Sequence, residues 1–214
     1  MSVPRNSIID ALTKAREGAP ERSFEQSVDL TVNFKDLDMR QPDNRVNLRL
    51  SLPNGIGNQK VLVFAQGDLA FRSRRAGADS VVEPRELDDL AKDKKAAKRR
   101  LKDYDIFIAE APLMPVVGRV AGSILGPRGK MPTPVPPQAP IDAILERERR
   151  TIVLRSRDKP FVKCKVGQET MNDDELVSNI ESVLSNIINS VKRGKNNIRS
   201  IYIKLTMGPA IKLL

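Results

Sequence analysis

Hydrophobic and polar residues alternate in four stretches of the chain, and all four lie toward its two ends. Residues 27–34 and 46–52 alternate near the start, and residues 161–166 and 200–205 alternate near the end. A period of two predicts a strand with one buried face and one face exposed to solvent. A polar loop containing Pro42 separates the first two strands, so we expect them to form an antiparallel pair with one polar face.

The middle of the chain has a different pattern. Residues 61–65 and 106–109 are continuously apolar, which is typical of strands that are buried on both faces. Two shorter stretches, 80–82 and 151–154, also have strand character, and stretches with helical spacing of apolar residues lie between these strands. Strands that alternate with helices predict a parallel sheet with helices on its faces.

Two further helices are expected in the terminal parts of the chain. The first begins near Asn6 or Ser7, either of which can cap it, and ends before Gly18. The second begins after Asn172 with an acidic first turn, which complements the helix dipole, and its apolar residues form one stripe that faces the core.

These patterns together predict an α+β protein of two domains. Residues 1–66 and 158–214 are expected to form a terminal α+β domain whose antiparallel sheet takes strands from both chain ends. Residues 67–157 are expected to form an inserted three-layer α/β domain of the Rossmann-like type. The chain then crosses between the domains twice, and paired short connections permit a hinge motion.

Composition narrows the classes of function. The formal net charge is +10, which favours nucleic acid as a partner, although a merely soluble basic protein has the same feature. The chain has no histidine, which removes the commonest general base and the commonest zinc ligand. Its single cysteine, Cys164, excludes an internal disulfide and a cysteine-based metal cluster. We therefore expect no catalytic residue, no metal site and no cofactor.

The sequence also predicts where the protein is located. It has no apolar run of the roughly 20 residues that a membrane helix needs, and its start lacks the apolar core of a signal peptide. We expect a cytoplasmic protein.

Residues 122–137 are the densest stretch of helix and strand breakers. They include three glycines, five prolines and two cations, so we expect an irregular but stiff loop. Arg128 and Lys130 are expected to face outward, where they suit a phosphate backbone or an acidic partner. The stretch is not a nucleotide-binding loop, because the glycine spacing is wrong and Met131 follows the lysine.

Polar positions of the terminal strands offer a second candidate surface. Hydroxyls, amides and cations on one rigid sheet can contact RNA phosphates and 2′-hydroxyls, although antiparallel sheets ordinarily have a solvated polar face. The positions include Ser27, Asp29, Lys165, Ser200 and Lys204.

The segment after the last strand, Thr206-Met-Gly-Pro209, is a third candidate. Thr206 can hydrogen-bond to phosphate or sugar, Met207 offers a flexible apolar surface, and Gly208 lets a backbone N–H approach a ligand closely. An ordinary strand-ending turn is the alternative. The basic run from Lys92 to Lys102 is a fourth candidate, for nonspecific attraction to RNA, and a solvated helix face is the alternative there.

Two motifs resemble the signatures of the ribosomal protein L-one family, and the resemblance covers nearly the whole chain. They are Ile124-Leu-Gly-Pro-Arg-Gly-Lys-Met-Pro132 and Ser200-Ile-Tyr-Ile-Lys-Leu-Thr-Met-Gly-Pro209. The segments Asp38-Met-Arg40 and Phe161-Val-Lys-Cys-Lys-Val-Gly167 are similar to the archaeal and eukaryotic branch of that family.

The resemblance implies the same nested arrangement of domains and a set of RNA-binding residues. Matched to the family motifs, these are Phe24, Ser27, Asp29, Ser200, Thr206, Met207 and Gly208. The residue before the phenylalanine is often basic in the family, whereas here it is Ser23 and the nearest cation is Arg22.

The resemblance also implies a function. The protein would be a structural component of the large ribosomal subunit that binds ribosomal RNA at the mobile stalk and helps to release deacylated tRNA from the exit site. It would also repress translation by binding its own mRNA, and it would be a monomer when free. Arg128 and Lys130 would make a secondary RNA or tRNA contact.

Two other functions share part of the evidence. A standalone RNA-binding regulator has every feature except incorporation into the ribosome. An α/β enzyme is the other class, and the lack of histidine, of a nucleophile motif and of a phosphate loop disfavours it.

Overall fold

The computed structural model describes residues 3–214, which form two compact units. The terminal unit contains the residues up to Gly57 and those from Arg150 to Leu214, and the inserted unit contains Asn58–Arg149. These limits differ from the predicted ones at 66/67 and 157/158. They differ because β3 (Val61–Phe64) pairs only with strands of the inserted unit, whereas β7 (Thr151–Arg155) pairs with a strand of the terminal unit. Periodicity identifies a strand without identifying its partner.

The terminal unit is organised around a four-stranded antiparallel sheet, which we call sheet A. Its strand order is β10–β9–β1–β8, so β1 (Ser27–Phe34) lies between β9 (Ile198–Leu205) and β8 (Phe161–Gln168). The short strand β10 (Ile211–Lys212) pairs with the outer edge of β9. Strands from both chain ends therefore form one sheet, as predicted.

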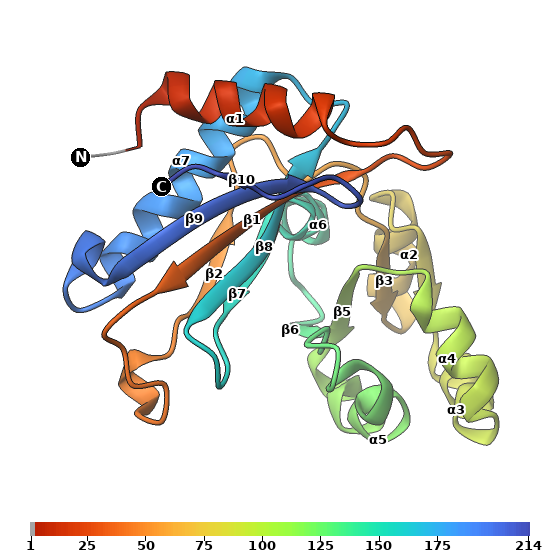
Figure 1. The fold of residues 1–214 in the computed structure, drawn as a ribbon. Helices are drawn as coiled ribbons and strands as arrows, with labels where there is room; N and C mark the ends of the chain where they lie inside the picture. Colours follow the sequence, from red (N-terminus) through yellow and green to blue (C-terminus); the bar gives the residue numbers. More distant parts are fainter. Residues whose placement is uncertain (1–2) are drawn as a thin grey trace. The chain divides into compact units, whose positions relative to one another are not determined.

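Two helices cover one face of sheet A (Figure 1). Helix α1 (Arg5–Glu17) contacts β9 and β10, and helix α7 (Asp173–Ser190) contacts β8 and α1. Asn172 and Glu175 form a capping box that satisfies backbone N–H groups at the start of α7. The inward positions of the strands and the apolar stripes of both helices form one aliphatic core. The other face of sheet A carries the polar positions.

The predicted pairing of the first two strands is wrong. Strand β2 (Asn47–Ser51) pairs with β7 in a separate two-stranded sheet, and both edges of β1 are occupied by β8 and β9. Alternation indicates only that one face of a strand is buried. All of these strands alternate, so the pattern does not identify which strands pair. Short 3-10 helices complete the unit, at Pro42–Asn44 (η1) and Gly194–Asn197 (η3).

The inserted unit is a three-layer α/β domain, as predicted. Its parallel sheet has the order β4–β3–β5–β6, with β4 at Ser80–Val82, β5 at Ile106–Glu110 and β6 at Thr133–Val135. Two helices pack on one face of the sheet, α2 (Gly67–Arg75) and α6 (Ile141–Arg149). Three pack on the other, α3 (Pro84–Lys92), α4 (Lys94–Lys102) and α5 (Met114–Leu125), which the 3-10 helix η2 (Ala111–Leu113) precedes.

The breaker-rich stretch 122–137 is more regular than predicted. Helix α5 continues to Leu125, so Gly122 is helical, and residues 133–135 form the edge strand β6. Pro134 is tolerated there because β6 pairs with β5 on one side only, which leaves the other edge without a need for a donor. The irregular parts of the stretch are thus residues 126–132, between these two elements, and residues 136–137, which follow β6.

Candidate nucleic-acid interface

The polar face of sheet A brings three of the predicted site residues into one row. Asp29 on β1 lies opposite Lys165 on β8 and opposite Lys204 on β9. The row forms because both neighbouring strands are in register with β1 at this position, and because residues opposite one another in a sheet point to the same face. One carboxylate therefore lies between two cationic side chains.

A third lysine completes this cluster. The ammonium Nζ of Lys163 lies 2.9 Å from Oδ2 of Asp29, whose side chain is only 17% exposed, while half of the Lys163 side chain remains exposed. A carboxylate accepts hydrogen bonds and repels phosphate, so we expect Asp29 to position the lysines rather than to bind the RNA backbone. The cluster thus combines three lysines with one carboxylate.

Thr206 and Ser27 join the ends of β9 and β1. The backbone N–H of Ser27 donates to the Thr206 hydroxyl at 3.0 Å, and the same hydroxyl lies 3.4 Å from the Ser27 carbonyl oxygen. The threonine side chain thereby continues the ladder of sheet A past the last backbone pair. Both residues remain partly exposed, so this pair forms a rigid corner of the polar face.

Gln26 is a buried residue that stabilises this corner through hydrogen bonds. The sequence analysis did not identify Gln26. Its side chain is 3% exposed; its amide Nε2 donates to the Pro20 carbonyl at 3.0 Å, and its Oε1 accepts from the Met207 backbone N–H at 3.0 Å. Its own backbone N–H donates to a carboxylate oxygen of Glu169. A polar residue in phase with the buried positions Val28 and Leu30 is the signal that would have indicated a buried amide.

Two apolar side chains stand at the surface beside this corner. Phe24 is 49% exposed and Met207 is 50% exposed, although both belong to residue types that are usually buried. Gln26 connects their segments, because it follows Phe24 closely in the chain and binds the Met207 backbone. A flat ring and a flexible thioether in such positions can pack on sugars or bases.

Gly208 has a packing role in the structure, beside its predicted role in approach to a ligand. Its N–H already donates to the Leu205 carbonyl at 3.1 Å. A Cβ at this position would lie 3.1 Å from the Ala19 Cβ and 3.4 Å from the Ala15 carbonyl oxygen. The glycine therefore lets the turn after β9 pack closely on the end of α1, which fixes the position of Met207.

Ser200 lies at the opposite end of β9 from Thr206. It is 8% exposed, and its hydroxyl accepts a hydrogen bond from the Asn33 amide at 2.9 Å. Ser200 and Thr206 are six positions apart in the sequence, or about 20 Å at about 3.3 Å per residue of extended strand. The predicted residues of sheet A therefore extend along the whole polar face rather than forming one cluster.

The two predicted cations of the inserted unit, Arg128 and Lys130, differ in how far their charged groups are available to a ligand. Arg128 is exposed and precedes Gly129, whose φ of 71° shapes the turn. The expectation that Lys130 faces outward is wrong, because its ammonium donates to the Tyr104 carbonyl at 3.0 Å and pairs with Asp105 at 3.1 Å. These contacts anchor the loop, so Arg128 is the stronger candidate for a ligand contact.

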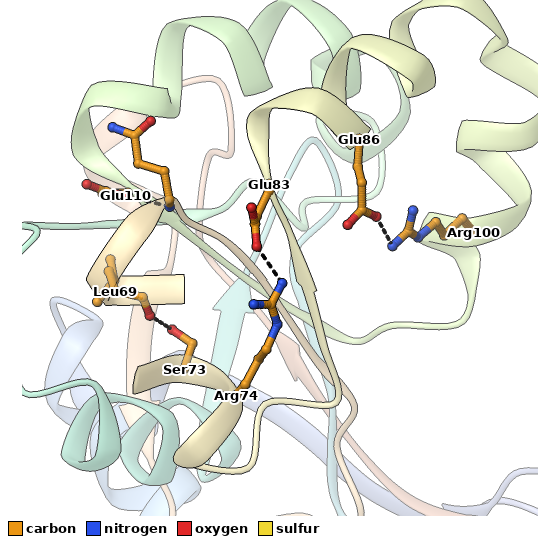
Figure 2. A network of polar contacts seen from close by, with 8 residues as sticks. Leu69, Ser73, Arg74, Glu83, Glu86, Arg100 and Glu110 are labelled. Carbon is orange, nitrogen blue, oxygen red and sulfur yellow. Dashed lines mark hydrogen bonds and ion pairs between the residues drawn. The ribbon is translucent and has the colours of Figure 1, made fainter. Parts of the chain in front are cut away.

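The predicted basic run from Lys92 to Lys102 is interrupted. Asp93 ends α3 and caps α4, since its carboxylate accepts from the N–H groups of Lys95 and Ala96. Arg100 pairs with Glu86 at 2.6 Å, as Figure 2 shows, and Lys92 pairs with Asp89 at 2.8 Å. Part of the positive charge is thus neutralised within the unit.

The carboxyl end of the parallel sheet is where an α/β enzyme would bind its ligand, so its residues test that alternative function. In open α/β sheets, ligands bind beyond this edge, with phosphates at a helix N-terminus. Here the Glu110 carboxylate, which is 4% exposed, accepts from the Gln66 N–H at 2.9 Å at the start of α2 (Figure 2). The Glu110 side chain thus already accepts from a backbone N–H in the place where a phosphate would bind, so the edge is unsuited to a nucleotide.

Residues 3–214 contain no group of three or more acidic, histidine or cysteine side chains placed to hold a metal ion. None of the helices in that range combines the length and hydropathy of a membrane-spanning segment.

Comparison with known proteins yields one family. Residues 13–209 match the model of the ribosomal protein L1p/L10e family. The chain is 45% identical over 215 residues to the large ribosomal subunit protein uL1 of Pyrococcus horikoshii, covering 100% of this chain and 98% of the relative. It is 43% identical over 211 residues to the protein of that name from Methanocella arvoryzae, covering 98% and 99%.

The relatives are mainly archaeal, which confirms the predicted branch. Members of this family are structural proteins of the cytoplasmic ribosome rather than enzymes, so the predicted lack of enzymatic activity and the predicted location are also confirmed. The family model and the full-length relatives agree over nearly the whole chain. This chain therefore belongs to the ribosomal protein L1p/L10e family.

Proposed function

We propose that this protein is a structural component of the large ribosomal subunit that binds ribosomal RNA through the polar face of sheet A. The observation that carries the proposal is the asymmetry of that sheet. Helices α1 and α7 cover one face, and the other presents lysines, hydroxyls and amides on a rigid antiparallel frame. Folded RNA is recognised by its shape, through contacts to phosphates and 2′-hydroxyls that such a frame can supply.

Each part of the face has its own role in this proposal. Lys163, Lys165 and Lys204 contact phosphates, with Asp29 holding them in place. Thr206 bonds to phosphate or sugar at the corner that Gln26 supports, while Phe24 and Met207 pack on sugars or bases. Because the corner is internally hydrogen-bonded, little order has to be gained on binding, and this favours affinity.

Finer roles rest on the family. We include in the proposal a position on the mobile stalk, a role in releasing deacylated tRNA from the exit site, and repression of translation through the protein's own mRNA. Arg128 supports the tRNA role, since it is an exposed cation on an anchored loop of the inserted unit. Replacing Arg128 with alanine should then weaken tRNA binding while leaving ribosomal RNA binding through sheet A unchanged.

The first experiment is titration of a large-subunit stalk RNA fragment, with scrambled RNA as competitor, at two salt concentrations. Thr206→Ala and Met207→Ala should each weaken specific binding by about 1–3 kcal/mol, the scale of one good polar contact or stacking platform. Thr13→Ala and Met131→Ala are matched controls, because both residues are exposed and lie outside the polar face.

Three outcomes would overturn the proposal in whole or in part. Weak binding that collapses with salt would mean that the charge of +10 alone explains the attraction. Unaltered affinity in both site variants would remove the corner from the interface. If binding is specific but the protein does not co-sediment with large subunits, the standalone regulator is the correct function.

A further inference from the structure

A groove lies at the Ser200 end of sheet A, and Ser200 is the one residue of its lining that belongs to the RNA-binding residues named above. It has a volume of about 410 Å³ and lies entirely within the terminal unit, on the polar face. Pockets that hold small organic groups start at about 300 Å³. The residues that line it are Asn33, Phe34, Lys159, Pro160, Phe161, Arg199, Ser200 and Tyr202.

The floor of the groove is polar and its sides are aromatic. Asn33 lies opposite Ser200 on β9 and opposite Phe161 on β8. Two strand spacings, or about 10 Å, therefore separate Phe161 from Ser200, with Asn33 between them. Tyr202 stands on the same face, two residues further along β9. Phe161 is 40% exposed, which is unusual for a phenylalanine and makes its side chain accessible to a partner.

The pair on the floor has unused hydrogen-bonding capacity of both kinds. Because Asn33 Nδ2 donates to the Ser200 oxygen, the hydroxyl proton of Ser200 points elsewhere and can be donated. The side-chain oxygen Oδ1 of Asn33 is a hydrogen-bond acceptor on the same floor. The edge of every nucleobase carries a donor next to an acceptor, so this arrangement complements a base without selecting one kind.

Charge at the groove points to the same class of ligand. Lys159 and Arg199 are exposed cations among the lining residues, and none of those residues is acidic. Aromatic faces, a donor–acceptor floor and flanking cations are the combination that binds single-stranded RNA, in which bases are splayed out and stacked on protein rings. A base within a duplex cannot enter, because its edge is paired and its faces are stacked.

We propose that this groove holds one unpaired base of the bound RNA. Phe161 and Tyr202 pack against the faces of the base, the Asn33–Ser200 pair bonds its edge, and Lys159 and Arg199 contact the neighbouring phosphates. This inference rests on the proposed function, which it deepens. It implies that the RNA extends along the strands from the Thr206 corner and presents an unstacked nucleotide about 20 Å away.

The test uses the full chain with two stalk RNA fragments that differ only in whether their loop nucleotides are unpaired or closed into a duplex by a complementary strand. Phe161→Ala and Tyr202→Ala should each weaken binding of the unpaired form about tenfold. They should leave binding of the closed form unchanged. Phe161→Trp should restore affinity, because it restores a stacking surface. Val153→Ala is the matched control, since Val153 is an apolar residue that is 53% exposed on a strand outside sheet A.

A second measurement detects the contact directly. The unpaired fragment with 4-thiouridine in its loop is irradiated in the complex, and the cross-linked peptide is identified by mass spectrometry. We expect the link at Phe161 or Tyr202. Specific binding that Thr206→Ala weakens, with no effect of either aromatic substitution and no link in the groove, would overturn this inference and leave the proposed function standing. If the unsubstituted chain shows no specific binding, both this inference and the proposed function are overturned.

Discussion

The ammonium of Lys163 and the carboxylate of Asp29 lie 2.9 Å apart across neighbouring strands, although the two residues do not face each other directly. Lys163 is paired with Thr31, one polar row from Asp29, and reaches back along the sheet to the carboxylate. Asp29 already has Lys165 and Lys204 as its direct neighbours. A single anion thus pairs with one lysine and lies opposite two others, and this arrangement distinguishes the face from a simple basic patch.

The first prediction concerns this anion. Asp29→Asn keeps the shape of the side chain and removes its charge, so the three lysines gain one uncompensated positive charge. The dependence of log K on log salt should become steeper by about 0.7–0.9. Discrimination against scrambled RNA should fall, because Lys163 loses the carboxylate that fixes its ammonium. Binding titrations over a salt series give both quantities, and Asp10→Asn on α1 is the control. An unchanged slope together with unchanged discrimination would contradict the role given to Asp29.

The second prediction concerns Gln26. Gln26→Leu keeps the volume but leaves the Met207 N–H and the Pro20 carbonyl without their partners. We expect the free energy of unfolding to fall by about 2 kcal/mol, within the usual cost of orphaned buried polar groups. The Met207 amide should exchange its hydrogen faster than in the unsubstituted protein. Urea unfolding and hydrogen exchange measure these effects, and Gln138→Leu tests the same change at an exposed site. Equal protection of the Met207 amide in both variants would show that Gln26 does not hold the corner.

A third prediction separates the two explanations for Gly208. Gly208→Ala places a Cβ 3.1 Å from the Ala19 Cβ, so either the turn or the end of α1 must shift. Overpacking of this kind costs about 1–3 kcal/mol of stability. Adding Ala19→Gly should recover most of the loss, since it removes the opposing methyl group. The matched control is Gly122→Ala, which meets no atom within 4 Å in α5 and should be stabilising by up to about 1 kcal/mol. Gly208→Ala with full stability but lost RNA affinity would instead favour close approach of a ligand.

The fourth prediction follows from Cys164. Burial raises the pKa of its thiol to about 12 from 9.0, and the nearby Asp29 carboxylate adds to the shift. The folded state therefore holds a proton that the unfolded state releases above about pH 9, so stability should fall as pH rises through that window. The slope due to this group is at most about 1.4 kcal/mol per pH unit. Urea unfolding from pH 8 upward should show that Cys164→Ala loses less stability with rising pH than the unsubstituted protein. Rapid reaction of the native thiol with a thiol reagent near neutral pH would contradict the burial on which this prediction rests.

The polar face of sheet A could be predicted from the sequence because burial of alternate residues leaves a direct trace in the chain. Residues 27–34, 161–166 and 200–205 alternate as expected, and their outward positions share one face. The cap of α7 at Asn172 left an equally local trace. These features depend on residues close together in the sequence, where propensity and periodicity act.

Pairing between strands left no such trace. β2 has the same alternation as β1, so nothing local revealed that its partner is β7 rather than β1. Pro134 looked like a strand breaker because its tolerance depends on an edge position that only the assembled sheet defines. Gln26 was missed for a related reason, since its partners Pro20 and Met207 come from both ends of the chain.

The last prediction tests the limits of the terminal unit as an independently folding domain. Leu52 donates its N–H to the Arg150 carbonyl at 2.9 Å, so the two chain crossings lie side by side and a short glycine linker can join residue 57 to residue 150. This fragment keeps sheet A, the β2–β7 pair and the whole apolar core, and we expect it to fold and to bind RNA. The alternative fragment joins residue 66 to residue 158, the limits expected from the sequence. It retains β3, whose four residues are all buried in the inserted unit, and it lacks β7. An unpaired β2 and an exposed apolar strand should make it aggregate. Circular dichroism, sedimentation and RNA titration compare the pair. If the fragment that joins residues 66 and 158 folds and the fragment that joins residues 57 and 150 does not, the domain limits expected from the sequence are correct.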